Sequence, residues 1–298
     1  MHITDSYSLL HYTCRLIGIA PYETKTINNQ KIVCKNKLYM KCTKIIYLYY
    51  LLFVCYNMQF VIQDIKRLTN IFSAIFYVVE ICIGHINFLS APIIFLYYLN
   101  LLCEIQNRLN KLFVILISEK NVKMKNLSKV NTFLCSLNVI FLILIFFCNV
   151  IDVGKHFSIN SFFQNVLLGI IHVPVELIKY LPSLNYFALA NVLKEIYSEI
   201  NQIIKFKRKD LEISIIRNID DFLKDTFQDI NSVFSISILL GTLNAFLTSV
   251  GGTVLLITER GNILTLDFTV WVFYYMFYLI TIIQITSLLA AEVSKNFY

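Results

Sequence analysis

The sequence predicts an all-α protein, a polytopic transmembrane helical bundle with six crossings. Six long apolar runs follow one another along the 298 residues, and each reaches the length of about 20 residues that crosses a bilayer core about 30 Å thick. Charged residues make up 15% of the chain and the mean hydropathy is +0.65, whereas soluble proteins carry about 25% charged residues. The runs lack the two-residue alternation of a membrane β-barrel. They lie at Ile45–Ile65, Ile71–Leu99, Thr132–Ile151, Phe162–Val192, Val233–Ile257 and Phe268–Ala290.

Lysine and arginine are distributed unevenly among the segments between these runs. The N-terminal segment, the segments after the second and fourth runs and the C-terminus hold 21 of them, whereas the other three segments hold 4. Because basic segments stay in the cytoplasm, both termini are predicted to be cytoplasmic, which excludes the G-protein-coupled receptor arrangement. The same distribution explains the pI of about 8.9 without a nucleic-acid partner. The sequon at Asn126 would then face the cytoplasm and stay unglycosylated.

The chain is predicted to form a single transmembrane domain over residues 1–298. Residues 1–44 are polar and basic, and we expect short helices at the cytoplasmic membrane surface. Tyrosines at the start of the first run are typical of an aromatic interface belt. The second run contains Pro92, which membrane helices tolerate where neighbouring groups satisfy the freed carbonyl.

Two amphipathic stretches lie outside the apolar runs. Leu101–Val130 has apolar residues at helical spacing and is interpreted as a cytoplasmic extension of the second helix. Residues 193–230 show a helix–turn–helix pattern with a break at Lys207–Asp210. They are predicted to be two cytoplasmic helices that could pack against copies in other subunits.

Ionisable residues at membrane depth are costly and usually face a cavity or a partner. The second run carries Glu80 and His85, and the fourth carries His172, Glu176 and Lys179. His172 and Glu176 are four residues apart, and Glu176 and Lys179 are three apart, so each pair shares a helix face. Two interpretations stay open: a polar wall of a ligand pocket, or an internally paired structural network.

A second group of candidates is expected in the outer halves of the helices. It comprises Asn149, Asn244, Trp271, Tyr274 and Tyr275. Aromatic rings with polar edges suit sugars, bitter alkaloids and other small organic molecules. Ordinary helix packing or an interfacial aromatic belt is the alternative explanation for each of these residues.

No motif for catalysis or cofactor binding occurs, so we expect neither enzyme activity nor a cofactor. The sequence has no hydrolase elbow, P-loop, zinc motif or dinucleotide fingerprint. His172 and Glu176 would supply only two ligands, too few for a metal site. The eight cysteines form no C-x-x-C pair, and we expect buried thiols without a structural disulfide.

Several short segments together resemble the insect gustatory receptor family, part of the insect chemoreceptor superfamily. Leu16–Pro21 is similar to that family's G-h-x-P segment. Ile230–Ser235, followed by Ile238–Leu240, is similar to its I-N-x-x-F-S-x-x-L-L segment. Trp271, followed by Ala291–Lys295, resembles its tryptophan-bearing sixth helix and the E-A-x-x-T motif after it.

The sequence departs from that family at its best-known signature, T-Y-h5-Q-F in a seventh crossing. Tyr278 and Gln284 keep the spacing, but Phe277 and Ile285 replace the flanking Thr and Phe. Either the last run is the signature helix and an earlier one has been missed, or the last run is helix six. We favour the second alignment, which fits the order of the motifs and the charge distribution, and which predicts a chain lacking the seventh helix.

The resemblance implies a chemosensory receptor subunit of the ligand-gated cation channel type that senses small-molecule tastants. It further implies a homo- or hetero-tetramer with related subunits in the plasma membrane. In that family the last helix lines the pore, so a chain without it is expected to pass no current alone. The alternative is a multi-pass transporter or lipid-modifying membrane protein, although the repeats and broken helices typical of transporters are not visible in the sequence.

Overall fold

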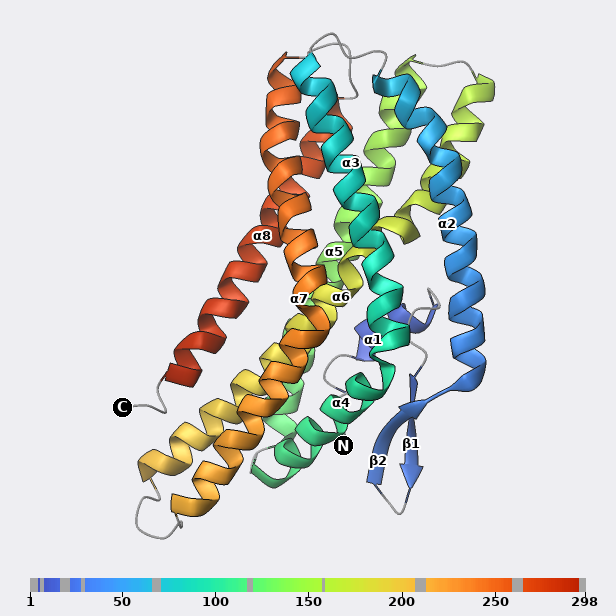
Figure 1. Cartoon of the computed structure of the whole chain (residues 1–298). Coiled ribbons are helices and arrows are strands. Elements are labelled where there is room, and N and C mark those ends of the chain that lie inside the picture. The colour runs from blue at the N-terminus through green and yellow to red at the C-terminus, as the bar shows by residue number, and fades with distance from the viewer. Residues whose placement is uncertain are drawn as a thin grey trace.

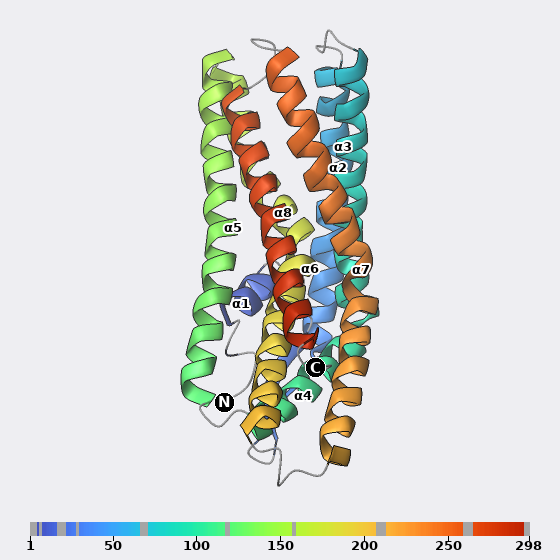
Figure 2. The ribbon, with the colours of Figure 1, turned by 90° about the vertical axis from the view of Figure 1, so that its left-hand side faces the viewer.

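The computed structural model describes residue 5 and residues 8–16, 22–27, 30–65, 71–116, 120–156, 159–206, 213–258 and 265–294. Within this part of the chain, long helices run side by side in a tall bundle (Figures 1 and 2). The elements are α1 (Ser8–Leu16), β1 (Tyr22–Ile27), β2 (Gln30–Lys35), α2 (Lys37–Ile65), α3 (Ile71–Pro92), the π-helical turn η2 (Ile93–Tyr97), α4 (Leu99–Leu116), α5 (Lys120–His156), α6 (Ile159–Phe206), α7 (Ile213–Thr258) and α8 (Thr265–Ser294).

All six predicted apolar runs fall within long helices, in α2, α3 with η2, α5, α6, α7 and α8. Among the described residues, four helical stretches are long and apolar enough to cross a membrane. They are Ala74–Tyr97, Asn126–Cys148, Arg217–Val254 and Thr269–Ser294. The chain is therefore a helical membrane protein by length and composition, and the further crossings by α2 and α6 stay predictions.

The two ends of the bundle differ in their content of lysine and arginine, as the count of basic residues along the sequence predicts. In Figure 1 the ends of α2, α5 and α7 and the starts of α3, α6 and α8 lie at the top. The β-hairpin, α4, the end of α6 and the start of α7 lie toward the bottom. The segments rich in lysine and arginine thus share one end, which we predict to be the cytoplasmic end.

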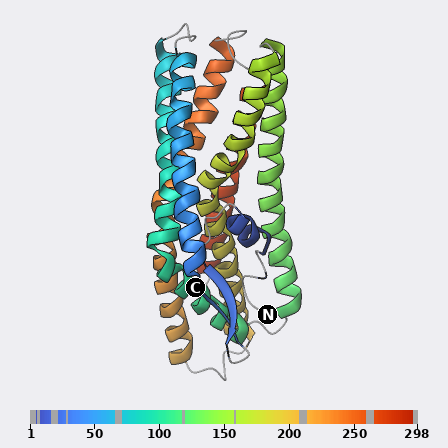
Figure 3. The same ribbon diagram turned by 90° about the vertical axis from the view of Figure 1, so that its right-hand side faces the viewer.

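The N-terminal segment is only partly helical, so the prediction of short helices over residues 1–44 is wrong for 22–27 and 30–35, which form strands. After α1, strands β1 and β2 pair antiparallel, with Tyr22 opposite Lys35 and Ile27 opposite Gln30. The hairpin signal is present in the sequence, because β-branched residues flank the pair Asn28-Asn29. Figure 3 shows the hairpin at the lower end of α2, beside α4.

Asn107 of α4 binds the backbone of the hairpin. The Asn107 side chain accepts a hydrogen bond from the Val33 amide at 2.9 Å and donates one to the Val33 carbonyl at 3.0 Å. The next residue, Arg108, donates to Asp229 of α7 at 2.8 Å and to Glu104 at 2.5 Å. Adjacent residues of α4 therefore tie the hairpin on one side and α7 on the other.

The expected extension of the second helix differs from the structure in two ways. The chain passes from α3 through the π-helical turn η2, directly after Pro92, before α4 begins. Proline lacks the amide hydrogen that a continuous α-helix needs at that point. In addition, α4 ends at Leu116 and residues 120–130 belong to α5, because the apolar spacing that ends at Leu116 gives way to a lysine-rich stretch.

The predicted helix–turn–helix over residues 193–230 is confirmed as the lower halves of α6 and α7. The predicted break at Lys207–Asp210 lies between these helices and outside the described residues. Leu193 and Ile196 of α6 are fully buried, as are Leu223 and Ile230 of α7. These residues form an apolar seam that joins the two helices below the apolar part of the bundle.

Glycine permits the close approach of α7 and α8. A Cβ placed on Gly241 would collide with the phenol oxygen of Tyr278. That oxygen lies 2.5 Å from the Ser183 hydroxyl of α6, so Tyr278 cannot move away without losing a buried hydrogen bond. Gly241 therefore lets three helices meet around one phenol group.

We predict that Gly241→Ala lowers the free energy of unfolding by about 1–3 kcal/mol, the usual cost of overpacking. The double variant Gly241→Ala, Tyr278→Phe should recover part of this loss, because it removes the colliding oxygen. Gly84→Ala is the control, since its added Cβ would meet its nearest atoms at 3.4 Å. Thermal unfolding of the purified protein measures all three, and equal losses for Gly84→Ala and Gly241→Ala would contradict this explanation.

The orientation predicts where glycosylation can occur. Leu264→Thr completes a sequon at Asn262, in the segment between α7 and α8, and we expect this asparagine to be glycosylated in eukaryotic cells. Native Asn126, at the opposite end of the bundle, should stay unmodified. A mobility shift that glycosidase reverses measures each site, and a glycan on Asn126 would show that the assigned orientation is inverted.

Candidate functional site

Two opposite charges of α6 lie inside the bundle. Glu176 is 2% exposed, and Lys179 donates a hydrogen bond from Nζ to Glu176 Oε1. Because a buried charge without a partner is costly, this pairing allows both groups to lie among packed helices. A Cβ placed on Gly84 of α3 would lie 3.4 Å from Lys179 Nζ, an ordinary contact distance, so α3 passes beside the ammonium group.

A second carboxylate, Glu80 of α3, lies near the same pair. The Thr248 hydroxyl of α7 lies 2.7 Å from Glu80 Oε1 and 3.0 Å from the carbonyl oxygen of Asn244, and its single proton can be donated to either. Glu80 is close enough to Lys179 and Glu176 for electrostatic interaction. Two carboxyl groups and one ammonium group therefore share the space between α3, α6 and α7.

Asn244 connects these charged groups to the tyrosines of α6 and α8. It is 1% exposed, and its Nδ2 donates to the Tyr275 hydroxyl at 3.1 Å and approaches that of Tyr180 at 3.4 Å. Its Oδ1 has no hydrogen-bond partner among the described residues. This oxygen would lie 3.4 Å from a Cβ on Gly84. A hydrogen-bond acceptor without a partner among the described residues therefore faces α3.

An aromatic cluster completes the arrangement. The Tyr180 ring meets those of Tyr274, Tyr275 and Tyr278 with centroids 5.3, 5.8 and 5.0 Å apart and interplanar angles of 64° or more. Trp271 stacks on Tyr275 at 5.5 Å. Edge-to-face and offset contacts of this kind add to the stabilisation from buried area alone. Four aromatic residues of α8 thus lie on one face, against α6.

The polar ends of this cluster are satisfied by neighbouring helices. The Tyr274 hydroxyl donates to Asn138 Oδ1 of α5 at 3.0 Å, and Tyr278 contacts Ser183 as described above. Together with the charged groups, the cluster joins five helices: α3, α5, α6, α7 and α8. We refer to it as the polar–aromatic cluster; its members are Glu80, Asn138, Glu176, Lys179, Tyr180, Ser183, Asn244, Thr248, Trp271, Tyr274, Tyr275 and Tyr278.

The polar–aromatic cluster lies at about half the depth of the apolar bundle. Glu80 is nine residues from the start of α3, and Tyr275 is ten residues from the start of α8. At a rise of about 1.5 Å per residue, both lie about 15 Å from the upper helix ends. Polar groups at this depth have no bulk water available, which explains their dense pairing.

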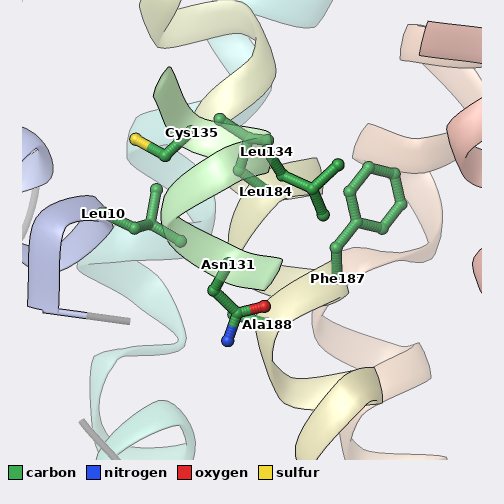
Figure 4. A pocket seen from close by; sticks show the side chains of 7 residues that line it. All are labelled: Leu10, Asn131, Leu134, Cys135, Leu184, Phe187 and Ala188. Atoms are coloured by element: carbon green, nitrogen blue, oxygen red, sulfur yellow. The ribbon is translucent and has the colours of Figure 1, made fainter. Parts of the chain in front are cut away.

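A separate small pocket lies between α1, α5 and α6 (Figure 4). Its lining is mainly apolar, and about 10 Å³ is open to the centre of a water molecule, enough for about one water. Asn131 supplies its polar side and accepts a hydrogen bond from Asn191 at 3.2 Å. The pocket is too small for an organic ligand. It is lined by Leu10, Asn131, Leu134, Cys135, Leu184, Phe187 and Ala188.

A comparison with protein families shows to which family the chain belongs. Residues 7–297 match the family model described as 7tm Chemosensory receptor. The chain belongs to this chemosensory receptor family. No curated protein matches it. The family match covers nearly the whole chain, confirms the resemblance to insect chemoreceptors, and supports a chemoreceptor role for a multi-pass membrane protein.

The receptor brings most of the predicted site residues together. Glu80, Glu176, Asn244, Trp271, Tyr274 and Tyr275 all belong to the polar–aromatic cluster. His85 lies beside it, within electrostatic reach of Glu176 and Lys179. Its Nδ1 lies 2.6 Å from the carbonyl oxygen of Ile81 in its own helix. The side chains of Asn149 and His172 lie outside the described part of the structure.

Several members of the polar–aromatic cluster were not predicted as site residues. Tyr180 and Thr248 each lie four residues after a predicted member, Glu176 and Asn244, and the i,i+4 spacing was the available signal. Tyr278 continues the stripe of Trp271, Tyr274 and Tyr275 at helical spacing. This spacing is a signal for Tyr278 in addition to its place in the family motif. Asn138 and Ser183 carry no signal that distinguishes them from other polar residues in helices.

The chemistry of the polar–aromatic cluster suits non-covalent recognition. It presents ring faces, hydroxyl groups, an ion pair and one unused amide oxygen. Among the described residues, no three His, Cys, Asp or Glu side chains are close enough to hold a metal ion. A small molecule with an apolar ring and a polar group would find complementary partners here.

We predict that Glu176→Leu lowers the folded yield strongly, because it leaves Lys179 buried without its carboxylate. Loss of one partner of a buried pair typically costs about 3–5 kcal/mol. The double variant Glu176→Leu, Lys179→Met should fold better than the single variant, since no lone charge remains. The monodisperse fraction in detergent measures both, and a double variant no better than the single would show that the pairing does not govern stability.

Proposed function

We propose that this receptor is a gustatory-type subunit of a ligand-gated cation channel in the plasma membrane. Its ligands are small-molecule tastants, and its N-terminus is cytoplasmic. Membership of the chemosensory receptor family supports a sensory role. The polar–aromatic cluster supports recognition of a small organic molecule, because it combines aromatic ring surfaces with hydrogen-bond donors and acceptors. One of these acceptors, Asn244 Oδ1, has no partner among the described residues.

The observation that carries this proposal is the position of Asn244. Its amide nitrogen contacts tyrosines of α6 and α8, while its oxygen faces α3 with no partner among the described residues. A ligand donor that reached this oxygen would satisfy a buried acceptor that is otherwise costly. Such a contact would change the packing of α3 against α6 and α7, and would link binding to helix movement.

The proposed assembly is a homo- or hetero-tetramer with related receptor subunits. The lower halves of α6 and α7 pack against each other, and the lower half of α6 is buried on most of its surface. Other residues of these halves are partly or fully exposed, among them Glu195 of α6 and Asp220 and Asp221 of α7. This remaining surface is available for neighbouring subunits, as closed symmetry requires.

We predict that Tyr275→Phe and Asn244→Leu raise the ligand concentration for half-maximal current by about fivefold or more. Tyr275→Phe removes one buried hydrogen bond, and Asn244→Leu removes two together with the unpaired oxygen. Each buried hydrogen bond is worth about 1 kcal/mol, which is about fivefold. The assay is ligand-evoked current in cells expressing the chain with related subunits, screened with sugars, alkaloids and other small organic molecules.

Phe273→Leu and Met276→Leu are the matched controls, because both side chains are exposed on the opposite face of α8. They should leave the half-maximal concentration unchanged at equal surface expression. Equal shifts in controls and site variants would remove the polar–aromatic cluster from ligand recognition. Substrate flux without evoked current would instead indicate a transporter.

A further inference from the structure

The first turns of α2 carry an exposed basic face. Lys37, Lys41 and Lys44 follow one another at spacings of four and three residues, so they share one side of the helix, and all three are exposed. Lys35, at the end of β2, is exposed as well. Residues 24–63 contain no aspartate or glutamate, so no acidic neighbour in this stretch neutralises these lysines.

The opposite side of α2 is fixed against the rest of the protein. Arg15 of α1 donates a hydrogen bond to the Tyr39 hydroxyl at 2.5 Å and lies over the Tyr39 ring. Thr43 is buried, and the Tyr47 ring stacks on Phe88 of α3 at 5.6 Å. These contacts set the rotation of α2 and direct the three lysines outward.

The basic face continues directly into an exposed apolar side of the helix, which faces lipid if α2 crosses the membrane as its sequence predicts. Leu48 and Leu52 extend the row of Lys37, Lys41 and Lys44 along the same face, and both are exposed, at 56% and 63%. Apolar side chains exposed at this level of a membrane protein contact acyl chains. The lysines therefore lie one or two turns from lipid tails on the same surface, which is the place of lipid headgroups.

The dimensions agree with this placement. From Ile45 to Ile65 the helix rises about 30 Å, the thickness of the hydrocarbon core. Lys37 to Lys44 adds about 10 Å, enough to span one headgroup layer of about 5–8 Å. The helix begins at this layer because Asn36 caps it, with Oδ1 accepting the amides of Leu38 and Tyr39 at 3.0 and 3.2 Å.

We propose that Lys35, Lys37, Lys41 and Lys44 form a binding surface for the headgroups of anionic phospholipids. Four exposed lysines directly before a membrane helix match the density of basic residues that recognises such headgroups in the cytoplasmic leaflet. The lysines bind the headgroup, while the acyl chains of the same lipid molecule cover Leu48 and Leu52. It also anchors α2, which has few contacts with the bundle apart from those to α1 and α3. This proposal is independent of the ligand and of channel activity.

The test uses the full chain in nanodiscs of phosphatidylcholine with or without 20% phosphatidylserine. Native mass spectrometry measures how many phosphatidylserine molecules stay bound and with what apparent affinity. The variant is Lys37→Gln, Lys41→Gln, Lys44→Gln. The matched control, Lys111→Gln, Lys205→Gln, Arg217→Gln, removes the same charge from exposed positions on α4, α6 and α7.

We expect the variant to bind phosphatidylserine at least tenfold more weakly, since each lysine near the surface is worth about fivefold. The control should bind like the natural sequence, and phosphatidylcholine binding should not change. Equal losses in variant and control would overturn the proposal, because they would indicate net charge alone. Competition by millimolar inorganic phosphate at constant ionic strength would also overturn it, because the surface would then be a site for soluble anions.

Discussion

The buried Glu176–Lys179 ion pair is the constraint on which the rest of the bundle depends. Removing two charges from water is costly, and their attraction offsets this cost only where further polar partners surround them. Glu80 of α3 is close enough to Lys179 for electrostatic attraction, and the Thr248 hydroxyl of α7 lies 2.7 Å from Glu80 Oε1. Gly84 of α3 lies beside Lys179 at an ordinary contact distance. The helices are therefore positioned by polar contacts at the centre as well as by apolar packing around them.

The lower part of the molecule is organised differently, around α4. Asn107 binds the backbone of β2 and Arg108 binds Asp229 of α7, so α4 joins the N-terminal segment to the long helices. Water is present at this level, and single polar contacts there are worth less than in the membrane core. A change in the packing of α3 against α7 around Asn244 would reach α4 directly, because η2 connects α3 to it.

The sequence predicts the helices better than it predicts their ends and contacts. The six apolar runs are local patterns, so hydropathy and periodicity place them within helices; the predicted break at Lys207–Asp210 lies between α6 and α7, outside the described residues. The hairpin of β1 and β2 was missed because the basic composition of residues 1–44 hid its alternation. Glu80 and Glu176 could be predicted as site residues because ionisable side chains at membrane depth are rare. Sequence spacing could not show that Glu80 meets Thr248, since the two residues are on helices far apart in the chain.

Fluorescence of Trp271 tests the central claim most directly. It is the single tryptophan of the 298 residues and stacks on Tyr275 within the polar–aromatic cluster, so intrinsic emission reports this place alone. We predict that a molecule that evokes current also changes the tryptophan emission of the purified receptor, over the same concentration range. Tyr275→Phe should shift both responses together. Unchanged emission at concentrations that saturate the current would contradict the assignment of ligand binding to this cluster.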